Sequence, residues 1–315
     1  MGFRTDLRLN DNPALVKAAE NAELLPIYIF DETKVANYQQ GEASLTWLYK
    51  SIQLLNKSLN NQLLILKGNP LQILKELIIN NKISGIYWNR NYSPWEIERD
   101  TRIKNEIKKL DIDCESFNGF LLWEPWEILK NDGTPYKVFT PFYRKGCLGS
   151  AAPRTPLPKP KKIEYAKKVL NNFEFNIASN TTNTWQKKIL NNALVGEKKA
   201  SDRLDFFIKN GLNDYKEGRN FPSQDNVSKL APNLHFGEIS PNQIWYTVSK
   251  LKNTQNTDHF LSELGWREFS NNLLYHFPHI ISENLQKKFN NFPWLNDENA
   301  LIKWQKGMTG IPLVD

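Results

Sequence analysis

LLPIYIF, residues 24–30, is an uninterrupted apolar run, and LLIL (63–66) and ISGIYW (83–88) repeat the pattern further along the chain. Short runs rich in β-branched and aromatic residues predict buried strands. Between them, residues 42–59 and 70–79 carry apolar side chains at helical spacing. Strands that alternate with helices predict an α/β domain, in which a parallel sheet is covered on both faces.

The composition changes after this region. Residues 126–197 contain proline-rich and polar pieces such as PRTPLPKPKK (153–162), which are typical of a long connector on the surface. From residue 198 onward the apolar period is helical. We therefore predict an α/β domain over residues 1–125, an interdomain linker over 126–197 and an all-α domain over 198–315.

The 41 Lys and Arg residues outnumber the 34 Asp and Glu residues, which gives the 315-residue chain a net charge of +7. A basic balance suits a polyanionic partner, although a lysine-rich surface explains it equally simply. Cys114 and Cys147 are too few for a disulfide framework and lack metal-ligand spacing, so we expect no metal site. No apolar run is long enough to span a bilayer, and we expect a cytoplasmic monomer.

FLSELGWREF, residues 260–269, is the most informative segment for function. On a helix, Phe260, Glu263, Leu264 and Arg267 share a face, and Trp266 lies beside them. Burying the two charged residues unpaired would be expensive. One interpretation is therefore an internal Glu–Arg pair that ties the helix to its neighbours. The other is a pocket floor, in which the carboxyl, the indole and the guanidinium contact a polar ligand.

Five motifs resemble the photolyase/cryptochrome family and follow its order. They are FRTDLRLNDNPAL (3–15), YKVFTPFYRK (136–145), SKLAPNLHFGEISPNQIW (228–245), ELGWREF (263–269) and WQKGMTGIPLVD (304–315). The resemblance is greatest to class I-type cyclobutane pyrimidine dimer photolyases. It implies a Rossmann-like first domain, a helical FAD-binding domain, and light-driven repair of pyrimidine dimers in DNA by electron transfer from reduced FAD.

The resemblance also implies residues for the flavin site. Tyr215, Phe260 and Arg267 match positions that line the flavin pocket. The loop that wraps the flavin diphosphate matches Val227, Ser228, Lys229, Leu230 and Ala231. Family members commonly carry hydroxyl residues at the first and last of these five positions, so two side-chain bonds are lost here while the backbone cradle remains.

Four residues match positions that act on DNA or supply electrons. Glu263 and Trp266 match the residues that grip the lesion, and Arg219 matches a basic residue near the DNA surface. Trp294 matches the outermost member of the tryptophan chain that re-reduces the flavin; locally it is equally a partly exposed packing residue. The four histidines show no metal-site spacing, and we interpret them as structural or surface residues.

A second, light-harvesting chromophore is implied more weakly. Glu96 matches a folate-contacting glutamate of some family members, while its neighbour Trp95 departs from their asparagine. The simpler interpretation places Glu96 on a solvated helix face. The resemblance leaves open whether the chromophore is methenyltetrahydrofolate or a deazaflavin.

Compared with the family, both ends of the sequence are expected to be short. A buried strand usually precedes the FRTDLRL motif, and further helices that complete the flavin site usually follow IPLVD. We therefore expect an incomplete FAD-binding domain that binds FAD poorly and does not repair DNA by itself. Two other functions stay open: a cryptochrome-like blue-light photoreceptor without repair, and a non-enzymatic remnant that binds nucleotides or nucleic acid.

Overall fold

The computed structural model describes residues 1–20, 23–33, 39–167, 169–177 and 183–315. The chain divides into two compact units, Met1–His276 and Phe277–Asp315. The first unit contains both the sheet and the principal helical core, and the second is a small helical segment.

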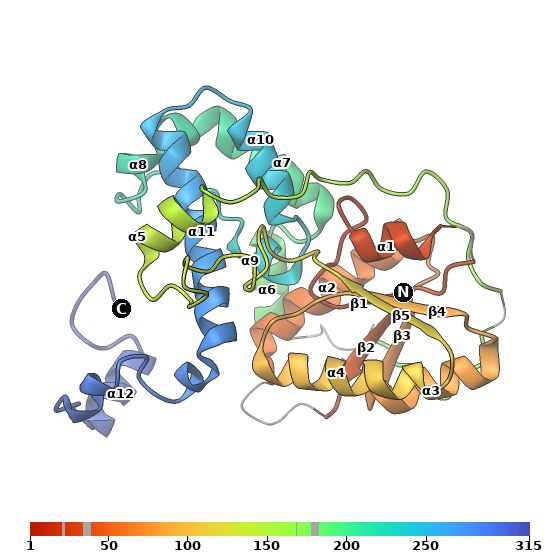
Figure 1. Ribbon diagram of the computed structural model, residues 1–315. Helices are drawn as coiled ribbons and strands as arrows, with labels where there is room; N and C mark the ends of the chain where they lie inside the picture. The colour runs from red at the N-terminus through yellow and green to blue at the C-terminus, as the bar shows by residue number, and fades with distance from the viewer. Residues whose placement is uncertain (21–22, 34–38, 168, 178–182) are drawn as a thin grey trace. The chain divides into compact units, whose positions relative to one another are not determined.

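A parallel sheet of five strands organises the first part of the chain (Figure 1). The strands lie in the order β3-β2-β1-β4-β5. Their bounds are β1 (Gly2–Phe3), β2 (Ile27–Asp31), β3 (Leu64–Gly68), β4 (Gly85–Asn89) and β5 (Asp113–Phe117). This arrangement confirms the predicted α/β class.

Helices cover both faces of the sheet. Successive side chains of β2 point to opposite faces, so they pack against different helices. Ile27 packs with residues of α3 (Pro70–Asn81) and α4 (Pro94–Lys108), which run along one side of the sheet in Figure 1. Tyr28 packs with residues of the opposite layer, formed by α1 (Pro13–Ala18) and α2 (Glu42–Ser58). The alternation of side chains along a strand therefore produces two apolar cores, one on each face.

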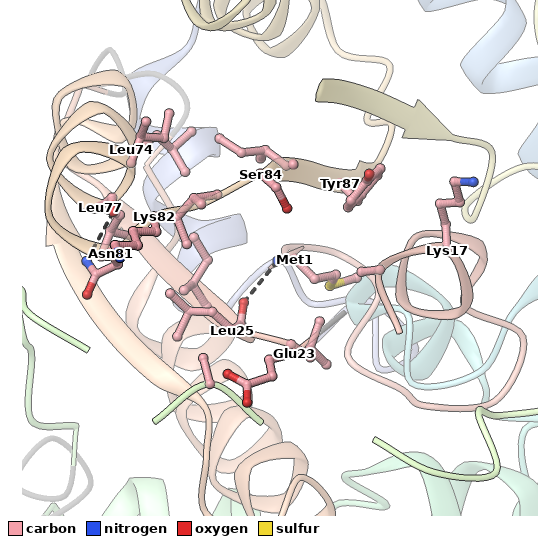
Figure 2. Close-up of a pocket in the computed structure, with 18 of the residues that line it drawn as sticks. Met1, Lys17, Glu23, Leu25, Leu74, Leu77, Asn81, Lys82, Ser84 and Tyr87 are labelled. Atoms are coloured by element: carbon pink, nitrogen blue, oxygen red, sulfur yellow. Dashed lines mark hydrogen bonds between the residues drawn. The ribbon is translucent and has the colours of Figure 1, made fainter. Parts of the chain in front are cut away.

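The central strand β1 is only two residues long, and its start adjoins a cavity of about 350 Å³ (Figure 2). The amine of Met1 donates to the carbonyl oxygen of Leu25 at 2.9 Å, and burial lowers the pKa of this amine to about 5. Leu25 and Ser84, which precede β2 and β4, line the cavity with Leu77 of α3. The strand that usually precedes the FRTDLRL motif was expected to be missing. A short first strand is nevertheless present, and its Gly2 pairs with both β2 and β4.

The segment expected to be a surface connector contributes to the helical core. It forms α5 (Phe139–Pro141), the π-helical turn η2 (Phe142–Cys147) and α6 (Thr184–Asn192). Phe142 and Tyr143 are buried against residues of the later helices. The apolar residues of the YKVFTPFYRK motif explain this difference from the prediction, because they need burial more than a connector does.

Six further elements complete the first unit, and apolar residues from most of them form one core with Phe142 and Tyr143. They are α7 (Glu197–Asn210), η3 (Leu212–Asp214), α8 (Tyr215–Gly218), α9 (Ala231–Phe236), α10 (Pro241–Ser249) and α11 (Gln255–His276). Among the helices of the described ranges, none combines the length and the apolar character needed to cross a membrane.

Arg8 connects the sheet domain to the helical part. Its fully buried guanidinium donates to the carbonyl oxygens of Asp11, Gly119 and Gly237, at 2.7, 2.7 and 3.0 Å for the Nη atoms. Gly237 has φ +67°, and a Cβ atom there would lie 2.0 Å from the carbonyl oxygen of Thr5. The close approach of the two parts therefore requires glycine at position 237.

Helix α11 makes a second connection to the sheet domain, through three side chains that follow one another at intervals of about one helical turn. Glu268 accepts hydrogen bonds from the backbone N–H groups of Leu122 and Trp123 at 2.8 and 3.3 Å. One and two turns later, Asn272 and His276 contact the carbonyl oxygen of Pro125 at 3.1 and 3.0 Å. The helix thus holds the backbone at the end of the α/β domain.

The second unit contains η4 (Pro278–Ile281), η5 (Lys287–Asn291) and α12 (Glu298–Gln305). The side chain of Asp297 caps α12 by accepting from the N–H of Ala300 at 3.0 Å.

Candidate functional site

Glu263 lies in a cluster of charged side chains between α8 and α11. The guanidinium of Arg219, at the end of α8, donates to Oε1 of Glu263. The same Nη1 atom lies 3.3 Å from Nε2 of His259, one helical turn before Glu263. Arg219 also lies over the ring of Tyr215, 5.4 Å from its centroid. The carboxylate is therefore paired and about one-third exposed.

Trp266 lies on the same helix and leaves 45% of its surface exposed. Its indole stacks on the ring of Phe139, with centroids 3.7 Å apart and planes 10° apart. Phe269 contacts the indole edge-on at 5.9 Å. Packing on one side fixes the ring and leaves aromatic surface free to stack on another flat group.

Tyr215 and Phe260, which were predicted to line a flavin pocket, come together in the structure. Their ring centroids lie 5.3 Å apart, and both contact Phe207 of α7, at 5.5 and 4.7 Å. All three rings are buried. Burial raises the pKa of the Tyr215 hydroxyl, so the phenol stays neutral. The two predicted residues thus form an aromatic wall behind the Arg219–Glu263 pair.

The loop over residues 227–231 is held from one side by Arg203 of α7. The guanidinium donates to the carbonyl oxygens of Val227 and Ser228, at 2.6 and 2.9 Å, and to the carboxylate of Asp225 at 2.8 and 3.1 Å. Arg203 and Lys229 together lower the pKa of Asp225 to about 2. The loop is therefore fixed by a residue outside the predicted motif.

The same loop turns N–H groups away from Arg203. In a trans peptide the N–H points opposite to the preceding carbonyl, so the N–H groups of Ser228 and Lys229 face the other side. Lys229 has φ +56° and Leu230 has φ −89°, and such a left-handed then right-handed pair forms a concave nest of N–H groups. This geometry fits a diphosphate, which offers only acceptor oxygens, even though Val227 and Ala231 lack hydroxyl groups.

Arg267 contacts the α/β domain and pairs with its sequence neighbour. Its Nη1 donates to Glu268 at 3.0 Å, and its guanidinium lies 4.1 Å from the ring centroid of Phe120. The pair expected between Glu263 and Arg267 is not formed: Arg267 pairs with Glu268, and Glu263 pairs with Arg219. Burial raises the pKa of Glu268 to about 7 despite this partner. Nη2 of Arg267 is buried and makes no hydrogen bond to the described residues.

Glu96 is half-buried and hydrogen-bonded on α4. It accepts from Nδ2 of Asn91 at 2.6 Å and from the hydroxyl of Ser93. A cavity of about 130 Å³ lies nearby, lined by Asn91, Trp88 and Trp126 among others. The indole N–H of Trp88 is buried and has no partner among the described residues. Glu96 therefore makes two side-chain hydrogen bonds, which the simpler interpretation as a solvated side chain did not include.

Trp294 belongs to the second unit and is 65% exposed. Its indole N–H donates to the carbonyl oxygen of Phe289 at 3.1 Å, and its ring lies 4.7 Å from that of Phe292. These contacts agree with the simpler interpretation of an exposed packing residue, and its role in electron transfer stays a prediction.

Sequence reasoning missed three residues of the site: Phe139, Arg203 and His259. The spacing of His259 and Glu263 at i and i+4 places them on one helix face and was the available signal. Phe139 lay inside a quoted motif without a role. Arg203 gave no signal, because its partners are backbone carbonyls of a loop more than 20 residues away.

Family models match both parts of the chain. Residues 3–161 match the model of DNA photolyase, and residues 260–315 match the model of the FAD binding domain of DNA photolyase. The chain therefore contains at least part of a photolyase-type FAD-binding domain.

Individual relatives agree with the family models. The deoxyribodipyrimidine photo-lyase of Agrobacterium fabrum is 35% identical over 99% of this chain, which spans 66% of that protein. Cryptochrome-2 of Arabidopsis thaliana is 29% identical, and the chain spans 54% of it. The crystal structure of a bacterial class III photolyase from Agrobacterium tumefaciens superimposes with a TM-score of 0.91 at 34% identity, over 99% of this chain and 66% of that one. The chain belongs to the family of DNA photolyases and cryptochromes.

Proposed function

We propose that the protein expressed from the full reading frame of this chain repairs cyclobutane pyrimidine dimers in DNA in a light-driven reaction that uses reduced FAD. The observation that carries the proposal is the pairing of Glu263 and Trp266 on one helix, with the carboxylate partly exposed and the indole fixed by Phe139 yet half open. Such a pair offers one hydrogen-bonding group and one stacking face to a base outside the duplex.

The residues present fit FAD. The nest at Lys229 and Leu230 would hold the diphosphate, and the buried Nη2 of Arg267, which has no partner among the described residues, could donate to a polar group. The chemistry that FAD supplies when bound is donation of an electron after excitation by light. Tyr215 and Phe260 exclude water from this side of the helical core, since both rings are buried.

The chain's own residues would position the lesion. A pyrimidine dimer stacks poorly, so moving it out of the duplex costs less than moving an intact base pair. Trp266 would stack on it, while the carboxylate of Glu263 would accept a hydrogen bond from an N–H group of a base edge and so orient the lesion. Arg219 would contact a backbone phosphate, and the net charge of +7 favours association with DNA.

A second chromophore in the α/β domain is part of the proposal. The cavity beside Trp88 and Trp126, with the buried indole N–H of Trp88 unpartnered among the described residues, supports a site for a flat polar ligand. Glu96 hydrogen-bonds Asn91, which lines this cavity. Extracted pigment that absorbs in addition to the flavin would support it.

A cryptochrome-like photoreceptor is the second candidate. The observation that favours it is the 29% identity to cryptochrome-2 of Arabidopsis thaliana over 99% of this chain. In that case light would reduce the bound flavin without repair of DNA.

Repair of a thymine-dimer oligonucleotide under blue light, by the protein expressed from its full reading frame, tests the proposal. The paired variants are Glu263→Ala and, as a control, Glu98→Ala, which removes an exposed carboxylate on α4. Light-dependent repair that is lost only in Glu263→Ala would support the proposal. Flavin photoreduction without repair would favour the photoreceptor, and the absence of both flavin binding and repair would overturn both.

A further inference from the structure

One nitrogen of the Arg219 guanidinium contacts both Glu263 and His259. Nη1 of Arg219 donates to Oε1 of Glu263 and lies 3.3 Å from Nε2 of His259. His259 Nε2 and Glu263 Oε1 lie 3.9 Å apart. All three side chains are about one-third exposed, so solvent and a polyanion reach them.

This geometry determines the protonation of His259. A guanidinium only donates hydrogen bonds, so Nε2 of His259 must accept the bond from Arg219. An imidazolium carries a proton on both nitrogens and accepts none. While it accepts this bond, Nε2 therefore carries no proton.

We propose that Arg219 exchanges partners when DNA binds, and that His259 replaces Arg219 as the hydrogen-bond partner of Glu263. The guanidinium leaves the carboxylate for a backbone phosphate, Nε2 of His259 takes up one proton from solvent, and the resulting imidazolium donates to Oε1 of Glu263. This inference rests on the DNA-binding function proposed above and adds a positioning role for His259.

The charges around His259 support the exchange. An arginine pairs well with phosphate, since both groups form two parallel hydrogen bonds. Its departure would leave the carboxylate of Glu263 unpaired unless another cation replaced it. The other carboxylate near His259 is Asp258, which already pairs with Arg144 at 2.6 and 2.8 Å. The ring of Tyr215 lies 6.1 Å from the imidazole ring of His259 and carries no charge. Glu263 is therefore the carboxylate available to a protonated His259.

The exchange couples DNA binding to proton uptake. Because the complex binds one proton more than the free protein, affinity falls as the pH rises through the range in which histidine changes charge. One proton corresponds to at most about tenfold weaker binding for each pH unit. The carboxylate of Glu263 meanwhile keeps a positively charged partner in both states, and it stays in place for the lesion.

The test measures DNA affinity as a function of pH. Fluorescence anisotropy with a labelled single-stranded oligonucleotide that carries one thymine dimer would be recorded from about pH 5.5 to about pH 8.5 at constant ionic strength. The variants are His259→Asn, whose amide donates and accepts without titrating, and His279→Asn, a control at an exposed histidine of the second unit. The native protein and His279→Asn should lose at least about threefold in affinity for each pH unit near neutrality. His259→Asn should show a flat profile, and equal slopes for native and His259→Asn would overturn the proposal.

A second measurement needs no DNA. NMR of the Hε1 proton of His259 follows its protonation in the free protein. In Arg219→Gln the guanidinium that contacts Nε2 is absent, so the response of the Hε1 resonance of His259 to pH should differ from that of the native protein. An unchanged titration would overturn the exchange, even if DNA binds. If the native protein binds no DNA at any pH while this difference appears, the proposed function fails and the local geometry stands.

Discussion

The indole of Trp266 lies flat against the ring of Phe139, with centroids 3.7 Å apart. One residue comes from α11 and the other from the segment that was expected to be a surface connector. An exposed tryptophan that stacks on a fixed ring has one orientation instead of several, which reduces the entropy lost when it stacks on a ligand.

Phe139→Ala should release Trp266 and destabilise the first unit. Loss of the stack alone should cost about 1 kcal/mol, in addition to the apolar area exposed. Denaturant unfolding followed by tryptophan fluorescence measures this change. Phe139→Tyr, which preserves the stacked ring, should unfold like the native protein, and equal stability of the alanine variant would show that the contact contributes nothing.

Glu268 should make stability depend on pH. Burial raises its pKa to about 7 in the folded protein, well above the value of about 4.3 for an exposed glutamate. The folded state therefore holds the proton more tightly, and the contribution of this group is fully present below about pH 4.3 and is lost as the pH rises through about 7.

Glu268→Gln should remove this loss, because glutamine does not titrate and its carbonyl still accepts from the N–H groups of Leu122 and Trp123. The free energy of unfolding, measured at several pH values, should fall more steeply for the native protein than for the variant, by at most about 4 kcal/mol over this window. Parallel curves would contradict the assignment.

Gly237→Ala should destabilise the protein far more than Gly133→Ala. Both glycines have positive φ, +67° and +77°, so both substitutions incur a backbone cost of about 1 kcal/mol. Only at Gly237 would the new Cβ meet another atom, the carbonyl oxygen of Thr5 at 2.0 Å, whereas nothing lies within 4 Å at Gly133. Thermal unfolding of the two variants separates the clash from the backbone cost, and similar melting temperatures would argue against the close approach.

Arg203→Lys should weaken FAD binding by about tenfold, because an ammonium cannot replace the forked contacts that hold Asp225, Val227 and Ser228. Titration of flavin fluorescence measures the affinity. Lys198→Ala, which removes an exposed ion pair with Asp202 on the same helix, serves as the control and should bind FAD like the native protein. An unchanged affinity in Arg203→Lys would show that the loop is held by other means.

Local sequence patterns predicted the elements that depend on local periodicity. The run at 24–30 covers all but the last residue of β2, and the helical spacing at 42–59 and 70–79 marks α2 and α3 within two residues of their ends. Glu263 and Trp266 were assigned to one helix, and they lie together on α11. These features depend on side chains near one another in the sequence.

The features that escaped prediction depend on contacts between distant segments. Arg219 reaches Glu263 across 44 residues, and Glu268 reaches Leu122 across 146. The sequence pattern offers no signal for such pairs, because many arrangements of the same helices satisfy the same periodicity. The burial of Phe142 and Tyr143 in a proline-rich region was hidden for the same reason.

Two of the connections between the sheet domain and the helical part use main-chain atoms on the receiving side. Arg8 binds the carbonyl oxygens of Gly119 and Gly237, while Glu268 and Asn272 bind N–H and carbonyl groups of residues 122–125. Any residue other than proline supplies both kinds of group. These two contacts therefore tolerate divergence of the receiving side chains, whereas the pairs Ser240–Asp11 and Trp47–Glu238 need both partners. A chimaera that exchanges the first domain for that of another family member should assemble where the backbone follows the same path and these side-chain pairs are kept.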